Sequence, residues 1–203
     1  MAKTKRKGRE EKQPYHHGDL KAALMKAALL LIDRHGIKGF SLKDAAARAG
    51  VSTAAPYRHF ADKDALLRSI QSEGFVLFDA ALALAFEGSD TALAKITEMG
   101  VAYVRFAMEH PAHFKVMFSL SDDDESGPGG GSTKGFMLLV EAVAALYPNA
   151  TPETRNDLVV VCWSIVHGFA VLQIDGAFDA AFGVGDAEAR LRRALGLLFD
   201  RTL

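Results

Sequence analysis

The sequence predicts an all-α protein, and three observations support this fold class: the abundant residue types, the small number of prolines and the spacing of apolar residues. Alanine, leucine, glutamate, lysine and arginine are abundant, and the 203 residues include only six prolines. Apolar residues recur at helical spacing, and the strict alternation of apolar and polar residues that indicates strands is not sustained. With 49% apolar residues, the chain is long enough to bury a substantial core. We expect about nine helices.

The first two helices are bounded by residues that favour helix ends. One helix is expected to begin at Asp19, a good N-cap, and to end at Gly36, because glycine is common directly after a helix. Ser41 and Asp44 have the spacing of a capping box, which predicts a short second helix. This helix ends before Gly50, which supplies the backbone freedom for a tight turn.

A third and a fourth helix are expected after this turn. Thr53 is the expected N-cap of the third, because Pro56 then falls at the third helical position, where its missing N–H has no partner within the helix. This helix ends near Phe60. Asp62 is the expected N-cap of a longer fourth helix, with apolar residues at helical spacing up to Gly88.

Five further helices are predicted from periodicity and from turn residues such as Pro111 and Pro152. The acidic and glycine-rich segment SDDDESGPGGGST at residues 121–133 cannot bury apolar surface, so we expect a loop there. The five helices are expected over residues 91–109, 114–118, 135–146, 152–174 and 187–201.

Charge divides the chain into two parts, although the net charge is −1. Residues 1–70 contain 15 Lys/Arg and 7 Asp/Glu, whereas residues 71–203 contain 9 and 18. A basic part joined to an acidic remainder is typical of an anion-binding module fused to a different domain. Six of the 15 cations lie in KTKRKGREEK, which is either a solvated tail or an arm that lies in a minor groove. We assign residues 1–15 to this tail.

Residues 16–68 are expected to form a DNA-binding domain, with a helix-turn-helix at about residues 40–59. Two short helices joined by a glycine turn, the second opening with a small polar residue, have the outline of this motif. Small residues such as Ala54 and Ala55 allow the second helix to approach base edges closely. The groups that can reach phosphate oxygens are those of Ser41, Lys43, Tyr57, His59 and Lys63.

The stretch GFSLKDAAARAGVSTAAPYRHFADKDALL resembles the helix-turn-helix of the TetR family of transcriptional regulators. The resemblance lies in the Gly-aromatic lead-in, the AA-x-x-AGVS turn, Y-R-H-F and D-K-x-A-L-L, and it covers about residues 19–68. The shorter W-S-I-V-H-G at residues 163–168 resembles the Trp, His and Gly motif of one TetR subgroup. The resemblance implies a three-helix DNA-binding domain, a larger helical ligand-binding and dimerisation domain over residues 69–203, and repression relieved by a small molecule.

The family's DNA contacts can be carried over position by position. The resemblance implies that Thr53, Ala54, Ala55 and Tyr57 face bases, while Ser41, Lys43, Tyr57, His59 and Lys63 contact the backbone. The Ala54–Ala55 pair and Pro56 depart from the commoner family pattern and leave few polar side chains for direct readout. DNA shape or the basic tail would then supply more of the specificity.

The body is expected to hold an apolar ligand pocket and a dimer interface. Trp163 and His167 are four residues apart and therefore share a helix face, which is either a packed core or dimer seam, or the wall of a cavity. Placing two helix-turn-helix units at the spacing of two half-sites requires a second, symmetric copy of the chain. The last two long helices are candidates for an intermolecular four-helix bundle. The pocket candidates are Phe78, Tyr103, Phe106, Phe114, Phe118, Trp163 and His167, and the interface candidates are Val160, Trp163, His167, Leu191, Leu195 and Leu198.

No catalytic or metal-binding constellation is expected. The single cysteine, Cys162, lies in the apolar run LVVVCW, which favours a buried hydrophobe and a reducing compartment. The pair His16–His17 and the pair His110 and His113 lack further convergent ligands, so we expect no metal and no cofactor. Charges or glycine interrupt each long apolar stretch, and we expect a cytoplasmic protein.

The function expected from the sequence is that of a transcriptional regulator, most simply a repressor that binds a palindromic operator as a homodimer and is released by a small apolar ligand. A helical protein-interaction module is one alternative, and the division of charge argues against it. A small helical enzyme for a hydrophobic substrate is another, and the sequence offers no convergent nucleophile, base or metal motif for it.

Overall fold

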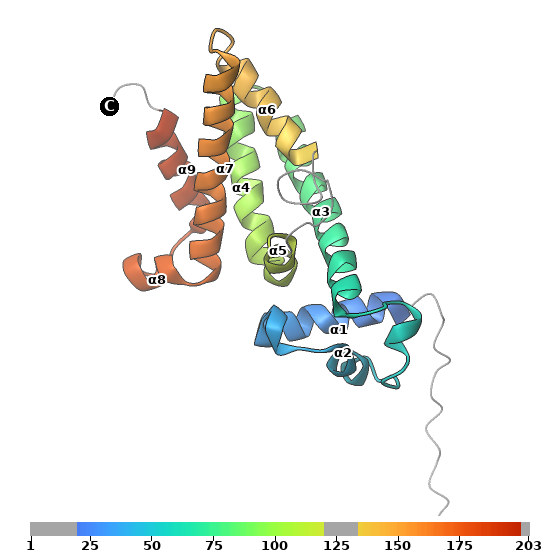
Figure 1. Ribbon diagram of the computed structural model, residues 1–203. Coiled ribbons are helices and arrows are strands. Elements are labelled where there is room, and N and C mark those ends of the chain that lie inside the picture. The colour runs from blue at the N-terminus through green and yellow to red at the C-terminus, as the bar shows by residue number, and fades with distance from the viewer. Residues whose placement is uncertain (1–19, 120–133, 200–203) are drawn as a thin grey trace, which may run out of the picture.

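The computed structural model describes residues 20–119 and 134–199, and all regular elements within these ranges are helical. They form a small head at one end of the molecule and a larger helical body above it (Figure 1). The all-α prediction is therefore confirmed. The predicted loop at 121–133, the basic tail and the expected cap Asp19 lie outside the described residues.

The head is built from the N-terminal elements and the first turns of a long helix. Its core gathers Leu24, Ile32 and Phe40 with Leu66 and Ile70, all of them buried. The elements are α1 (Leu20–His35), the 3₁₀ turn η1 (Ile37–Gly39), α2 (Leu42–Arg48), the 3₁₀ turn η2 (Pro56–Arg58) and α3 (Lys63–Glu87).

The body surrounds helix α4, which packs against α3, α5, α6, α7 and α9. Helices α3 and α6 lie on one side of α4, and α7 to α9 lie on the other (Figure 1). The bounds are α4 (Ala92–Glu109), α5 (Pro111–Met117), α6 (Lys134–Leu146), α7 (Pro152–Ile174), α8 (Ala177–Phe182) and α9 (Ala187–Phe199).

Side-chain caps confirm four of the predicted helix starts, whereas the helix predicted over residues 114–118 begins earlier, at Pro111. Ser41 Oγ accepts a hydrogen bond from Asp44 N, and the Asp44 carboxylate accepts one from Ser41 N, which is the predicted capping box. The side chains of Asp62, Thr91 and Thr151 likewise accept from the backbone three residues on, at the starts of α3, α4 and α7. These caps satisfy N–H groups that have no partner within their helices.

The prediction of a third α-helix is wrong, because a 3₁₀ turn forms there instead. Between residues 52 and 60 the regular structure is the single 3₁₀ turn Pro56–Arg58, and no side chain caps it, so Thr53 is not an N-cap. Pro56 has no N–H to donate to the Ser52 carbonyl, which accepts from Ala55 N at 3.0 Å instead. The Pro56 carbonyl then accepts from His59 N, which is the i to i+3 bond of a 3₁₀ turn, and also from Phe60 N.

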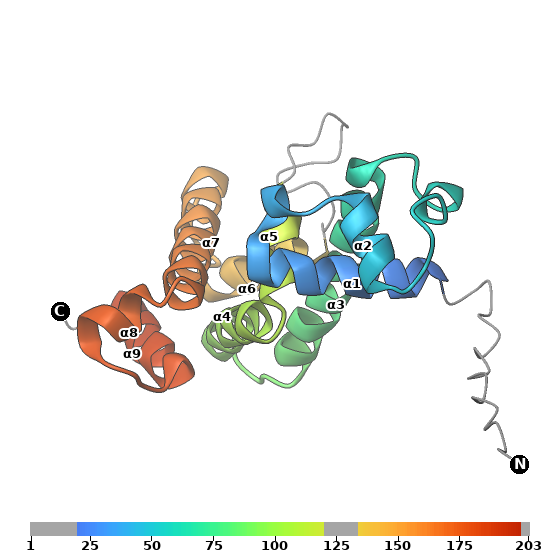
Figure 2. The ribbon, with the colours of Figure 1, turned by 90° about the horizontal axis from the view of Figure 1, so that it is seen from below.

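Helix α8 was not predicted from the sequence. It follows α7 after Gly176, which has a φ of +72°, and it ends at Gly183, which has a φ of +77°. A left-handed backbone favours glycine at both places, so the chain reverses direction sharply on either side of α8. Helices α8 and α9 consequently fold back beside α7 (Figure 2).

Helices α3 and α7 are long and apolar enough to cross a membrane by length and composition alone, contrary to the sequence expectation. Core helices of soluble proteins share this property. In this fold α3 and α7 pack against α4 from either side, so their apolar residues contribute to the body core.

Candidate DNA-binding head and ligand cavity

The segment from Thr53 to His59 forms an exposed edge of the head. The side chains of Thr53, Ala54, Tyr57 and His59 are exposed, and 55% of the Tyr57 surface is open to solvent. The fully buried Pro56 anchors this segment to the head, so the exposed residues project from a fixed turn. These four positions, with the exposed Lys43 on α2, remain available for DNA contact.

Two predicted contact residues have other roles in the described structure. Ala55 is half-buried and packs against the head core, so it does not face outward with Ala54. The Ser41 hydroxyl donates to Asp44 Oδ2 at 2.6 Å, and this hydrogen bond lowers the pKa of the Asp44 carboxyl. The Ser41 proton is thus already used within the capping box.

Lys63 is used inside the head. Its ammonium donates to the Ile37 carbonyl at 2.6 Å and to the Phe40 carbonyl at 2.9 Å, and it lies 4.5 Å from the centre of the Phe40 ring. The sequence predicts that this ammonium contacts a DNA phosphate. In the structure two of its three protons hold the turn η1 against the start of α3, so its first role is to tie the head together.

Arg58 is a candidate that the sequence analysis missed. It is exposed, it follows Tyr57 on η2, and it belongs to the Y-R-H-F stretch. A guanidinium is a strong phosphate donor, so the motif itself contained the signal. Counting over residues 20–70 of the sequence gives 9 Lys/Arg and 4 Asp/Glu, so the head is basic even without the tail.

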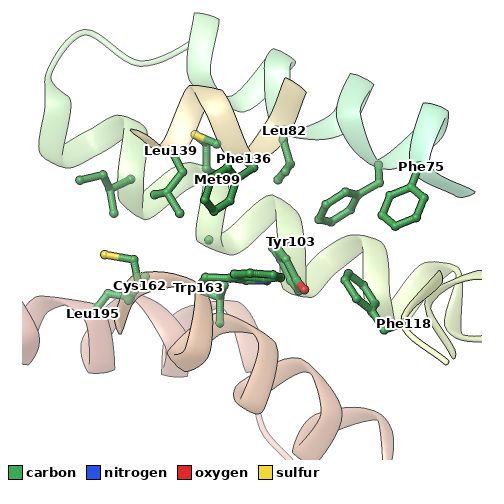
Figure 3. A pocket seen from close by; sticks show the side chains of 15 residues that line it. Phe75, Leu82, Met99, Tyr103, Phe118, Phe136, Leu139, Cys162, Trp163 and Leu195 are labelled. Atoms are coloured by element: carbon green, nitrogen blue, oxygen red, sulfur yellow. The ribbon is translucent and has the colours of Figure 1, made fainter. Parts of the chain in front are cut away.

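A cavity of about 70 Å³ lies in the body between α3, α4, α6, α7 and α9 (Figure 3). Phe75, Phe78 and Leu82 line it from α3, and Trp163 and Cys162 line it from α7. Phe78 is packed edge-on to Tyr103, with ring centres 4.9 Å apart. The remaining lining residues are Ile96, Met99, Gly100, Tyr103, Phe118, Gly135, Phe136, Leu139, Val166 and Leu195.

The predicted pocket residues divide into two groups. Phe78, Tyr103, Phe118 and Trp163 do line this cavity. Phe106, Phe114 and His167 do not; Phe114 and His167 lie on an outer groove of about 200 Å³ next to it, and Phe106 lies on a groove beside α3 and α4. Periodicity placed all seven in the body but could not show on which side of each helix the cavity lies.

A hydrogen bond joins the cavity wall to the outer groove. The Tyr103 hydroxyl and His167 Nδ1 are 2.8 Å apart. Burial raises the pKa of Tyr103, and burial lowers the pKa of His167 from 6.5, so both groups are favoured in their neutral forms.

The remaining titratable candidates have structural roles. Cys162 is buried, and burial raises the pKa of its thiol to about 11, which suppresses the reactive thiolate. His113 is buried and its Nε2 lies 3.2 Å from Glu73 Oε2, while His110 contacts the rings of Phe106 and His113. Within the described residues, no three His, Cys, Asp or Glu side chains could hold a metal ion together. His16 and His17 lie outside the described ranges.

Two of the predicted dimer-interface residues are not on the surface of the monomer. Leu191 and Leu195 are 0% and 1% exposed, because α9 turns this face toward α4, where Leu195 also lines the cavity. Trp163 lines the cavity and His167 is half-buried. Val160 and Leu198 are exposed, as an interface requires.

The head and the body each match a known domain. Residues 24–70 match "Bacterial regulatory proteins, tetR family", and residues 96–198, just over half of the chain, match "Tetracyclin repressor-like, C-terminal domain". No curated protein matches the sequence.

Solved structures share this fold over most of the chain. A protein of unknown function from Rhodococcus sp. RHA1 is 30% identical, with a TM-score of 0.71 over 92% of this chain and 96% of that one. A bacterial regulatory protein in the tetR family, from Rhodococcus RHA1, is 18% identical, with a TM-score of 0.64 over 88% and 94%. AibR, in complex with isovaleryl coenzyme A and operator DNA, is also 18% identical, with a TM-score of 0.64 over 89% and 98%.

The two domain matches occur in the order in which the structure places the basic head and the cavity-bearing body. The chain belongs to the TetR family of bacterial transcriptional regulators.

Proposed function

We propose that the protein is a cytoplasmic, homodimeric repressor whose heads bind a palindromic operator and whose body cavity takes a small molecule that releases it. Membership of the TetR family makes it a DNA-binding transcriptional regulator rather than an enzyme. The exposed, basic edge around Tyr57 supports the DNA-contacting role of the head. AibR, which is known with both a ligand and operator DNA, supports the combination of the two roles on this fold.

The observation that carries this proposal is the continuity of helix α3. Its first turns supply Leu66 and Ile70 to the head core, and its later turns supply Phe75, Phe78 and Leu82 to the cavity wall. A change in the width of the cavity therefore acts on the same rigid helix that anchors the head. In a dimer, rotation of this helix changes the spacing between the two heads, and operator affinity depends on that spacing.

Helix α5 provides a second connection between body and head. Its residues Ala112 and Val116 pack into the head core, while Met117 packs into the body core. The Met117 carbonyl accepts a hydrogen bond from the buried Gln71 side chain of α3 at 3.2 Å. Helices α3 and α5 thus move as a unit when the cavity changes shape.

A surface on α7 and α9 suits the dimer interface. Val160, Val161, Val171 and Leu172 are exposed at helical spacing along one face of α7, with Gly168 between them. A Cβ at Gly168 would meet nothing within 4 Å in the monomer, so a partner helix can approach the backbone closely there. Leu197 and Leu198 extend the apolar surface on α9.

DNA binding by the head is tested by fluorescence anisotropy on duplexes tiled across the DNA that flanks the gene. We expect sequence-selective binding that survives near-physiological salt, with the stoichiometry of a dimer. Tyr57→Ala and Lys43→Ala should each weaken binding, and Lys43→Ala should reduce the slope of log K against log salt by about 1.

The matched control is Lys134→Ala, which removes an exposed lysine from the body. This variant should bind the operator like the wild type. If the three variants bind alike, or if only the deletion of residues 1–15 abolishes binding, the head does not recognise the operator.

A further inference from the structure

We propose that the ligand of the cavity is an uncharged, mainly apolar molecule that carries one neutral oxygen, such as a hydroxyl or a carbonyl, and that Tyr103 binds this oxygen. The inference rests on the proposed function, because it assigns a chemical class to the small molecule that releases the repressor. The lining of the cavity and the hydrogen bond between Tyr103 and His167 carry it.

The described residues that line the cavity carry no charge. They are aliphatic and aromatic, apart from glycines, the Met99 thioether, the Cys162 thiol, the Tyr103 hydroxyl and the Trp163 indole. The thiol is held protonated, since burial raises its pKa to about 11. An anion or a cation that left water for this cavity would find no opposite charge on the lining, and the cost of losing its hydration would be several kcal/mol. A neutral ligand avoids this cost.

Tyr103 places a polar atom in the wall of this apolar space. Figure 3 shows its side chain next to Trp163 at the cavity wall, and its hydroxyl is hydrogen-bonded to His167 Nδ1 at 2.8 Å. When neutral His167 carries its proton on Nε2, the Tyr103 hydroxyl donates to His167 Nδ1. The lone pairs of the Tyr103 oxygen then remain for a ligand hydroxyl.

His167 makes the Tyr103 site adaptable to a ligand carbonyl as well. Neutral histidine carries its proton on either nitrogen, and the ring of His167 also lines the outer groove, with Lys115 of α5 and Asp175 that follows α7. When the proton lies on Nδ1, His167 donates to the Tyr103 oxygen, and the Tyr103 proton turns toward the ligand. His167 is therefore a positioning residue, since it acts on the ligand only through Tyr103.

The size of the cavity links binding to movement. Its volume of about 70 Å³ is well below the roughly 150 Å³ of an apolar cavity that is known to hold benzene. A ligand of that size or larger that lies wholly inside the cavity must push the walls apart, including the wall that Phe78 of α3 supplies. Compounds that share one rigid skeleton share the cost of this expansion, so their relative affinities report on the polar group alone.

The test uses the full-length, DNA-free protein and four compounds with the same rigid cage: adamantane, 1-adamantanol, 1-adamantanecarboxylate and 1-adamantanamine. Trp163 is the only tryptophan of the chain and lines the cavity, so its fluorescence reports occupancy directly. We expect the alcohol to bind about fivefold to tenfold more tightly than the hydrocarbon, because it gains one hydrogen bond. The carboxylate and the ammonium compound should bind at least tenfold more weakly than the alcohol.

Flat compounds provide a second skeleton. Naphthalene, 2-naphthol and 2-naphthoate are compared by the rise in Tm that each produces at equal concentration. The rise in Tm should again be largest for the alcohol, smaller for the hydrocarbon and smallest for the carboxylate.

Variants show whether Tyr103 is the anchor. Tyr103→Phe should abolish the advantage of the alcohol over the hydrocarbon and leave hydrocarbon binding intact. Tyr147→Phe removes a hydroxyl from the same body at a position that does not line the cavity, and it should keep the advantage. His167→Asn retains a group that can accept or donate near Nδ1 and should keep most of the advantage, whereas His167→Leu should reduce it.

Three results would overturn the inference: a charged compound that binds as tightly as the alcohol, an unchanged advantage of the alcohol in Tyr103→Phe, or no binding by either series. These titrations contain no DNA. If the protein binds no operator, the proposed function is refuted, but the titrations with the compounds can still be interpreted. If none of the compounds binds, the inference is refuted and the operator-binding result is unaffected.

Discussion

Replacing Lys63 by methionine tests the role that the structure gives this residue. Methionine keeps a long apolar side chain and removes the ammonium that donates to the carbonyls of Ile37 and Phe40. These two carbonyls then lose a charged donor in a partly buried site. We expect the head to lose stability even in the absence of DNA.

The magnitude follows from the contacts that are lost. Hydrogen bonds to charged groups contribute about 1.5–3 kcal/mol when buried, and this pair, at 2.6 and 2.9 Å, is only partly buried. We therefore expect a loss of about 2 kcal/mol in the free energy of unfolding. For a protein of this length, that corresponds to a fall in Tm of roughly 4–8 °C.

The assay is thermal unfolding by circular dichroism, with the salt dependence of operator affinity measured alongside. Lys134→Met serves as the control, because it removes an exposed lysine that lies far from the head in sequence. A phosphate contact would behave in the opposite way: Tm would stay constant and the salt slope would fall by about 1. That pair of results would refute the structural role of Lys63.

Three further predictions concern the body. Leu191→Ala, at a fully buried position on α9, should cost about 2–4 kcal/mol in urea unfolding, and a loss below about 1 kcal/mol would contradict its burial. Gly74→Ala places a Cβ 2.7 Å from Met117 Sδ, and the cost of overpacking, about 1–3 kcal/mol, should outweigh a gain of about 1 kcal/mol in helix propensity. The Tm should therefore fall, and a rise in Tm would show that α3 and α5 separate easily. Burial lowers the pKa of His167, so the unfolded chain binds a proton more readily than the folded protein, and the free energy of unfolding should fall as the pH drops below 6.5. His167→Asn should flatten this fall in pH-dependent urea unfolding, and an unchanged slope would assign the fall to other groups.

Local signals predicted the helix starts at which a side chain caps the backbone. Ser41, Asp62, Thr91 and Thr151 cap the helices that follow them, because each cap needs only the few residues around it. The same local view failed at Pro56. A proline tolerated in the first turn of an α-helix is equally compatible with the 3₁₀ turn that forms there, and the sequence offers no local means to choose.

Tertiary contacts decided the site residues that the sequence could not place. Lys63 lies in a motif suited to phosphate contact, but its ammonium is within reach of two carbonyls more than 20 residues away in sequence. Leu191 and Leu195 share an apolar face that suits either a partner subunit or the chain's own α4, and the fold places α4 there. Tyr103 and His167 are paired across 64 positions, so no periodicity within one helix could join them.

Helix α3, in the function proposed above, links the cavity to the DNA-binding head. To test this link, the complex of the protein and its operator is titrated with a compound that changes Trp163 fluorescence, while the anisotropy of the labelled DNA is recorded in the same cuvette. We expect DNA to be released as the cavity fills. Saturating operator should weaken the compound's affinity by the same factor by which the compound weakens operator affinity. Full occupancy of the cavity with unchanged operator affinity would contradict it.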